Sequence, residues 1–178
     1  FGSFVLLAAL IAGPAFAGVE IGKTAPDYSF KDINGEEHSI SDLDGKIVVL
    51  EWTNPNCPFV HKFYDQGDMP RIQAEAKKMS KDVYWIAINS SAKDKEGYFA
   101  TDEEAKADVA ARKYAGDIYV RDPEGKFGKL YGAKTTPHMF VIDEDNKVAY
   151  AGAIDSIKSP DQPDIAKADN YVLAAVKA

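Results

Sequence analysis

A single cysteine, Cys57, is the side chain in this sequence with the clearest capacity for covalent chemistry. It lies in the stretch EWTNPNCPFVHKFY, after an apolar run and directly before Pro58. Proline favours the first turn of a helix, so the spacing predicts that a helix begins at Cys57. The backbone amides and the positive dipole end of a helix favour a thiolate over a thiol. The pattern therefore predicts a nucleophilic sulfur.

A buried cysteine that packs as a small apolar side chain is the commoner alternative. The neighbours Asn54, Pro55, Asn56 and Pro58 make a poor core environment and a good turn, which favours the reactive interpretation. A lone cysteine also has no partner within the chain for a disulfide, so Cys57 is free, buried, metal-bound or paired with another molecule.

The segments around Cys57 alternate between strand and helix patterns. An Asn-Gly pair predicts a hairpin around Asn34-Gly35, and apolar runs predict buried strands over 46–52, 83–89 and 118–122. A closing hairpin is predicted over 135–155, with its turn at Asp145-Asn146. Helical patterns cover 58–79, as one helix with a break near Gly67 or as two helices in sequence. Further helical patterns cover 101–114, from a capping box of Thr101 and Glu104, 125–132, and 167–178. This order predicts an α/β fold, a central mixed sheet flanked by helices with an N-terminal β-hairpin.

Composition limits the possible partners. The chain has 178 residues, of which 46% are hydrophobic and 28% charged, values typical of one globular domain. The formal net charge is -7 and no long basic run is present, so nucleic acid is not an expected partner.

The first seventeen residues have the pattern of an export signal. FGSFVLLAALIAGPAFA carries no charge and ends in Ala-Phe-Ala, a small-x-small cleavage pattern. We interpret residues 1–17 as a truncated signal peptide and residues 18–178 as the folded domain. The apolar stretch is too short to span a bilayer comfortably, so we expect no integral membrane segment in the mature protein and a periplasmic or secreted location.

Three motifs together resemble a known family. WTNPNCPFVHKFY, YGAKTTPHMFVID and AYAGAID are similar to segments of the thioredoxin-like redoxins, which include the alkyl hydroperoxide reductase/thiol-specific antioxidant proteins and exported thiol-disulfide oxidoreductases. The likeness runs from about Gly22 to the end. It implies a thioredoxin-like fold and the activity of a thiol-dependent oxidoreductase or antioxidant protein on peroxide or on thiol and disulfide substrates. It also implies that Cys57 is the nucleophile and that a cis Thr136-Pro137 bond faces it.

The same resemblance implies a substrate groove and a reaction partner. The groove residues it implies are Trp52, Pro58, Thr136 and Pro137. The expected partner is an external thiol reductant or a protein thiol or disulfide, and no cofactor is implied.

The sequence also departs from the family pattern. Val60 stands where dithiol oxidoreductases of this family have a second cysteine, so Cys57 is expected to stop at a mixed disulfide or a sulfenic acid. Asn54 and Leu50 stand where peroxiredoxins have a hydroxyl residue and a proline. Thr53, one position off register, is the candidate replacement hydroxyl. Asn54 and Asn56 are expected to orient the turn.

Histidines leave a second function class open. His61 lies four residues after Cys57 and shares its helix face, where it is a candidate base or proton donor. By likeness to copper chaperones of the superfamily, Cys57, His61 and His138 form a candidate copper set. Solvated histidines are the competing interpretation, and His38 is expected at the surface. A third possibility is a redox-inert relative that holds partners in its groove.

Overall fold

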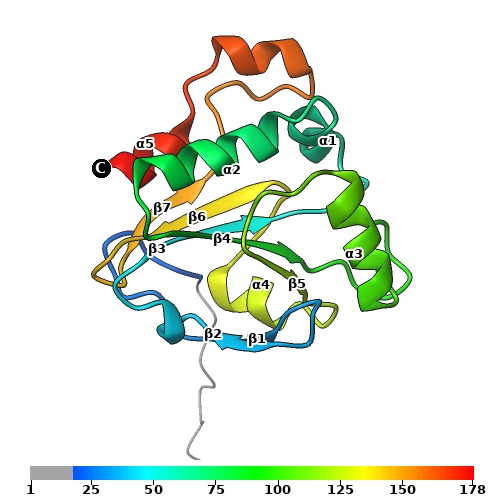
Figure 1. Ribbon diagram of the computed structural model, residues 1–178, viewed down its shortest axis with the longest axis horizontal. Helices are drawn as coiled ribbons and strands as arrows, with labels where there is room; N and C mark the ends of the chain where they lie inside the picture. Colours follow the sequence, from blue (N-terminus) through cyan, green and yellow to red (C-terminus); the bar gives the residue numbers. More distant parts are fainter. Residues whose placement is uncertain (1–17) are drawn as a thin grey trace, which may run out of the picture.

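A five-stranded mixed sheet forms the centre of the computed structural model, which describes residues 18–178 (Figure 1). The predicted signal peptide, residues 1–17, lies outside the described residues. The strand order is β5-β4-β3-β6-β7, and the strands are β3 (Ile47–Trp52), β4 (Val83–Asn89), β5 (Ile118–Arg121), β6 (His138–Ile142) and β7 (Val148–Gly152). β3, β4 and β5 run parallel, while β6 and β7 are antiparallel to their neighbours.

Helices cover both faces of this sheet. They are α1 (Pro58–Tyr64), α2 (Asp68–Met79), α3 (Asp102–Ala111), α4 (Lys126–Tyr131) and α5 (Tyr171–Lys177). Figure 1 shows α1, α2 and α5 above the sheet, and α4 below it together with the hairpin of β1 (Ser29–Lys31) and β2 (Glu37–Ser39). Short 3-10 helices span Ser41–Leu43 and Gln162–Lys167. The predicted thioredoxin-like layering and the N-terminal hairpin are confirmed.

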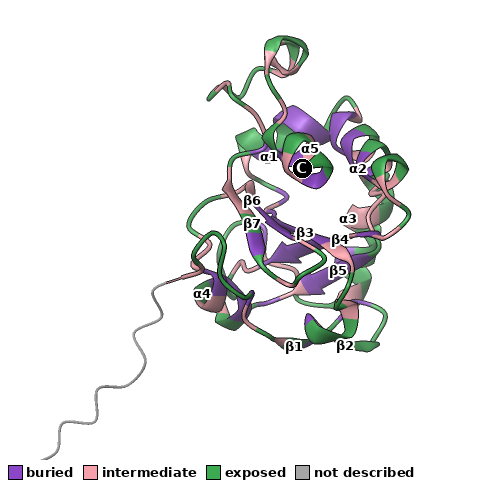
Figure 2. Cartoon of the chain, turned by 90° about the vertical axis from the view of Figure 1, so that its left-hand side faces the viewer, coloured by how far each residue is buried: buried purple, intermediate pink, exposed green. Residues whose placement is uncertain are grey.

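Alternation along β3 divides the core into two layers. Leu50 and Trp52 point into the cluster that contains Phe127, whereas Val49 points into the cluster beneath α1, α2 and α5. Figure 2 shows the buried residues concentrated in the sheet and on the inward faces of the helices. β3 is covered on both faces, as its continuous apolar run predicts.

Some local predictions need correction. The region 58–79 forms two helices in sequence, the second of the two predicted alternatives, and they are separated where Gly67 takes a left-handed conformation with φ of 78°. Thr101 caps α3 as predicted, with its hydroxyl accepting from the Glu104 amide at 3.2 Å, but this helix ends at Ala111. His38 is not a fully exposed surface residue, because its side chain is only 24% exposed. None of the helices within residues 18–178 combines the length and apolar character needed to cross a membrane.

Candidate active site around Cys57

Cys57 occupies the junction that the sequence predicts. It is the N-cap of α1, with extended backbone angles and Pro58 in the first helical turn. Its thiol is half-buried and donates to the Thr136 carbonyl at 3.0 Å. The Thr136-Pro137 peptide bond is cis. Two segments 79 residues apart in sequence therefore meet at the sulfur.

Hydrogen bonds fix the turn that carries Cys57. The Asn54 carbonyl accepts from the Cys57 amide at 3.1 Å, and Asn54 Oδ1 accepts from the Asn56 amide at 2.8 Å. From the other side, Arg112 Nη2 donates to the Pro55 carbonyl at 2.6 Å. The side chain of Asn54 orients the turn, as predicted, whereas Arg112 was not foreseen from the sequence. Arg112 lies 57 residues away, and no pattern near it indicates this contact.

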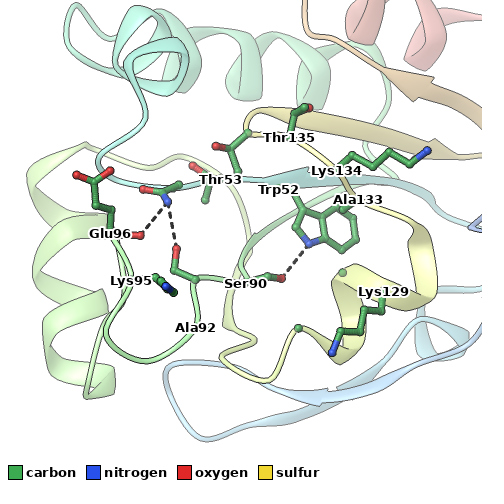
Figure 3. Close-up of a pocket in the computed structure, with 15 residues that line it drawn as sticks. Trp52, Thr53, Ser90, Ala92, Lys95, Glu96, Lys129, Ala133, Lys134 and Thr135 are labelled. Atoms are coloured by element: carbon green, nitrogen blue, oxygen red, sulfur yellow. Dashed lines mark hydrogen bonds between the residues drawn. The ribbon is translucent and has the colours of Figure 1, made fainter.

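Asn54 also ties this turn to the loop after β4. Its Nδ2 group donates to Ser91 Oγ at 3.2 Å and to the Glu96 carbonyl at 3.0 Å (Figure 3). Gly97 follows with a φ of 75°, and a Cβ there would lie 2.2 Å from Asn54 Oδ1. Glycine is thus required at 97 both by the backbone conformation and by the close approach of Asn54.

Two recesses open on either side of Thr135 and Thr136. The first, called here the polar pocket, has a volume of about 480 Å³ and is lined by Trp52, Thr53, Asn54, Ser90, Ser91, Ala92, Lys95, Glu96, Gly125, Gly128, Lys129, Ala133, Lys134, Thr135 and Thr136 (Figure 3). The second, called here the apolar groove, has a volume of about 310 Å³ and is lined by Phe59, Lys62, Phe63, Thr135, Thr136, Pro137 and residues 153–159.

The predicted groove residues divide between these recesses. Trp52 belongs to the polar pocket, Pro137 to the apolar groove, and Thr136 to both. Pro58 is exposed at the start of α1 and lines neither of the two. The prediction of one groove therefore needs correction, because alternation along β3 turns Trp52 to the sheet face opposite α1. There its Nε1 group donates to Ser90 Oγ at 3.1 Å.

Thr53 is buried at the end of β3 and lines the polar pocket, and its amide donates to the Ile88 carbonyl at 2.9 Å. The candidate hydroxyl therefore lies on the wall of a recess that adjoins Thr136. Its assignment as a catalytic group stays a prediction.

Within the described residues, no hydrogen bond joins His61 or His138 to the Cys57 sulfur. His61 Nδ1 lies 2.9 Å from Asp65 Oδ1, one helical turn further from Cys57. His138 pairs with Trp52 across the strands, and its Nδ1 accepts from the Lys134 amide at 3.3 Å. Burial, and then the charge of Lys134, lower the pKa of His138.

The candidate copper set is accordingly not assembled. Within residues 18–178, the three side chains close enough to hold an ion together are Asp32, Glu36 and His38 of the hairpin. Cys57, His61 and His138 do not form such a group in that part of the chain. Their separation follows from strand alternation, which turns His138 toward the aromatic cluster around Phe140.

A buried carboxylate lies under α1 and was not predicted. Glu51 has no exposed surface, and it accepts from Trp85 Nε1 at 2.8 Å, Tyr64 Oη at 2.8 Å and Gln73 Nε2 at 3.2 Å. Burial raises its pKa, and the three donors partly offset that rise. A lone glutamate inside an apolar strand run was the available sequence signal.

Comparison with known proteins identifies the family. The model of the AhpC/TSA family matches residues 21–151. The chain belongs to the AhpC/TSA family. This agrees with the predicted redoxin identity and with the prediction of a thiol-dependent oxidoreductase.

Curated relatives and solved structures give a consistent result. The chain is 30% identical over 136 residues to the thiol-disulfide oxidoreductase ResA of Bacillus thuringiensis subsp. konkukian, covering 73% of this chain and 68% of ResA. It is 28% identical to the thioredoxin-like protein YneN of Bacillus subtilis, covering 71% and 68%. A putative thiol:disulfide interchange protein DsbE from Chlorobium tepidum shares the fold, with a TM-score of 0.63, 24% identity, and coverage of 89% of this chain and 99% of that one.

Proposed function

We propose that this AhpC/TSA-family protein is a thiol-dependent oxidoreductase in which Cys57 alone is the nucleophile and the substrate is the disulfide of a polypeptide. The observation that carries the proposal is the position of the Cys57 sulfur, 3.0 Å from the Thr136 carbonyl where the two recesses meet. The similarity to curated thiol-disulfide oxidoreductases supports it.

The reaction has two exchange steps. The Cys57 thiolate attacks one sulfur of the substrate disulfide, a mixed disulfide forms, and the other substrate sulfur leaves as a thiolate. Because the chain has one cysteine, an external thiol then attacks the mixed disulfide and releases Cys57 as a thiolate. A second equivalent of the external thiol completes the reduction, so one substrate disulfide becomes two thiols and two external thiols become one disulfide.

Asn54 and Arg112 hold the turn that carries Cys57, through their bonds to the Asn56 amide and the Pro55 carbonyl. Thr136 supplies the carbonyl that holds the resting thiol. Peroxide is the alternative oxidant, which would convert Cys57 to a sulfenic acid that the same external thiol reduces. The pattern of residues 1–17 supports a place of action outside the cytoplasm.

Trapping the mixed disulfide tests the proposal directly. The protein is mixed with a disulfide-containing peptide, quenched with acid and analysed by intact mass spectrometry. With a peptide that carries an internal disulfide, the expected result is a mass increase equal to the whole peptide, because the released sulfur stays on the same peptide. This adduct should form about tenfold or more faster than a small free thiol reacts with the same peptide at the same pH, and it should be absent in Cys57→Ser. Oxidation by peroxide without any mixed disulfide would favour the peroxidase alternative, and no reaction with either would overturn the proposal.

A further inference from the structure

A buried ion pair joins α1, the helix that Cys57 caps, to the segment after β7, and it takes no part in the steps above. Lys62 Nζ donates to Asp155 Oδ2 at 2.9 Å and to the Ile157 carbonyl at 3.1 Å. The side chains of Lys62 and Asp155 are only 1% and 7% exposed. The ammonium group also lies 4.9 Å from the centre of the Phe63 ring. Charges buried to this degree need close partners, and here both have them.

The pair spans the apolar groove from one wall to the other. Lys62 belongs to α1, five residues after Cys57, while Asp155 and Ile157 belong to the segment 153–159 that follows β7. This segment contains no helix or strand, apart from an isolated bridge between Asp155 and Asn170. The bonds from Lys62 are therefore a direct tie between this wall and the helix that carries the nucleophile.

A contribution to stability alone does not explain the pair. Replacing a buried ion pair with apolar side chains of similar volume is often neutral or stabilising, because both charges must lose their water. A charged pair with two defined hydrogen bonds does, however, favour one arrangement of the chain over others. In this groove, the pair determines how far α1, which carries Phe59 and Phe63, lies from the opposite wall, which carries Ile154 and Ile157.

We propose that Lys62 is a positioning residue that holds the 153–159 wall against α1 and so shapes the apolar groove for a large apolar side chain next to the sulfur that Cys57 attacks. This inference rests on the proposed function and adds to it the class of substrate, a polypeptide with an aromatic or branched apolar residue beside its reactive sulfur. Lys62 acts through the wall and does not touch the reacting atoms.

A second lysine provides a matched control. Lys77 Nζ donates to Asp117 Oδ1 at 2.7 Å and to the Ala115 carbonyl at 2.9 Å, which is the same bonding pattern. Lys77 and Asp117 are each 30% exposed, and neither lines the apolar groove. Loss of this pair changes charge and hydrogen bonding equally but leaves the groove intact.

The experiment compares two maleimides that alkylate Cys57 by the same reaction, N-phenylmaleimide and N-(2-hydroxyethyl)maleimide. The readout is the rate constant for N-phenylmaleimide divided by the rate constant for N-(2-hydroxyethyl)maleimide. This ratio is then divided by the same ratio measured with glutathione, which corrects for the intrinsic reactivity of the two reagents. A ring bound in the groove should raise this normalised ratio about fivefold to tenfold in the unmodified protein. Lys62→Met should bring it close to one, whereas Lys77→Met should leave it unchanged.

A second variant keeps the test conclusive if Lys62→Met does not fold. In Lys62→Met/Asp155→Leu both charges are removed, so no unpaired charge stays buried. It should fold and still show the low ratio. A ratio equal to that of the unmodified protein in the folded variants would overturn the positioning role. Failure of the proposed function looks different, because Cys57 would then keep its maleimide preference and yet form no mixed disulfide with the peptide.

Discussion

The two recesses that meet at Thr135 and Thr136 are walled by different physical means. The loop after β4, which walls the polar pocket, is held by neutral hydrogen bonds from the Asn54 amide and by a bond from the Ser90 hydroxyl to the Asp122 carboxylate. The segment after β7, which walls the apolar groove, is held by a buried ion pair. The Thr136 carbonyl that accepts from Cys57 belongs to both. The thiol of Cys57 is thus bonded to a residue that lines two recesses of different chemistry.

The difference predicts how each wall responds to mutation. A neutral hydrogen bond contributes about 0.5–1.5 kcal/mol, and its loss is local. A buried ion pair that loses one member leaves an unpaired charge, which is much more costly. A single substitution in the groove wall should therefore lower the free energy of unfolding more than a single substitution in the pocket wall.

Asp155→Ala should give the largest effect. The ammonium of Lys62 would stay buried without its carboxylate, so the free energy of unfolding should fall by about 3–5 kcal/mol in urea denaturation. Lys77→Met, at the exposed counterpart, should cost only about 0.2–1 kcal/mol. Equal losses in the two variants would contradict the view that burial distinguishes these pairs.

Gly97→Ala should have the next largest effect and should act on the polar pocket. The new Cβ must displace the Asn54 side chain and take a left-handed backbone conformation, at a combined cost of about 2–3 kcal/mol. Gly35→Ala is the control, since its φ is 87° and no atom lies within 4 Å of the added Cβ. It should cost about 1 kcal/mol. Similar losses at both positions would show that Asn54 moves aside freely.

Ser90→Ala should weaken the same wall by less. The Ser90 hydroxyl donates to Asp122 Oδ2 at 2.6 Å and accepts from Trp52 Nε1 at 3.1 Å. Its loss should cost about 1–2 kcal/mol and alter the fluorescence of Trp52. Ser41→Ala, in the exposed turn before β3, should change stability by no more than about 0.5 kcal/mol. An unchanged Trp52 spectrum in Ser90→Ala would argue against this hydrogen bond.

The features predicted correctly from the sequence are those encoded by neighbouring residues. The apolar run before Cys57 indicated the central strand, Pro58 indicated the helix start, and Asn34-Gly35 indicated the hairpin. Each signal acts over a few residues, so the order of strands and helices and the place of the sulfur could be derived.

The features that were missed depend on contacts between distant segments. Lys62 and Asp155 are 93 residues apart, and Arg112 is 57 residues from Pro55. A lysine on a short amphipathic helix is expected to face solvent, and no neighbouring residue in the sequence indicates its partner. The division of the predicted groove into two recesses has the same origin, because it depends on which sheet face each segment crosses.

Glu51→Gln should have the smallest effect, seen as a change with pH. Glu51 and Trp52 are neighbours on β3 that point to opposite faces, so this carboxyl lies on the groove side of the sheet. Burial raises its pKa above the ordinary value of 4.5, and hydrogen bonds from Trp85, Tyr64 and Gln73 oppose that rise. Between these two pKa values the folded state binds more protons than the unfolded state. The free energy of unfolding should therefore fall as pH rises through this window.

Glutamine at 51 cannot titrate, so Glu51→Gln should lose this slope and should gain stability relative to the unmodified protein as pH increases above 4.5 through this window. Denaturation across that range measures the difference. Tyr64→Phe provides the opposite case, since it removes one donor that lowers the pKa of Glu51 and should make the slope steeper. A pH-independent difference between Glu51→Gln and the unmodified protein would mean that the three donors offset burial completely. Glu51 would then stay ionised over the whole pH range, and its three hydrogen-bond donors would compensate for the burial of its charge.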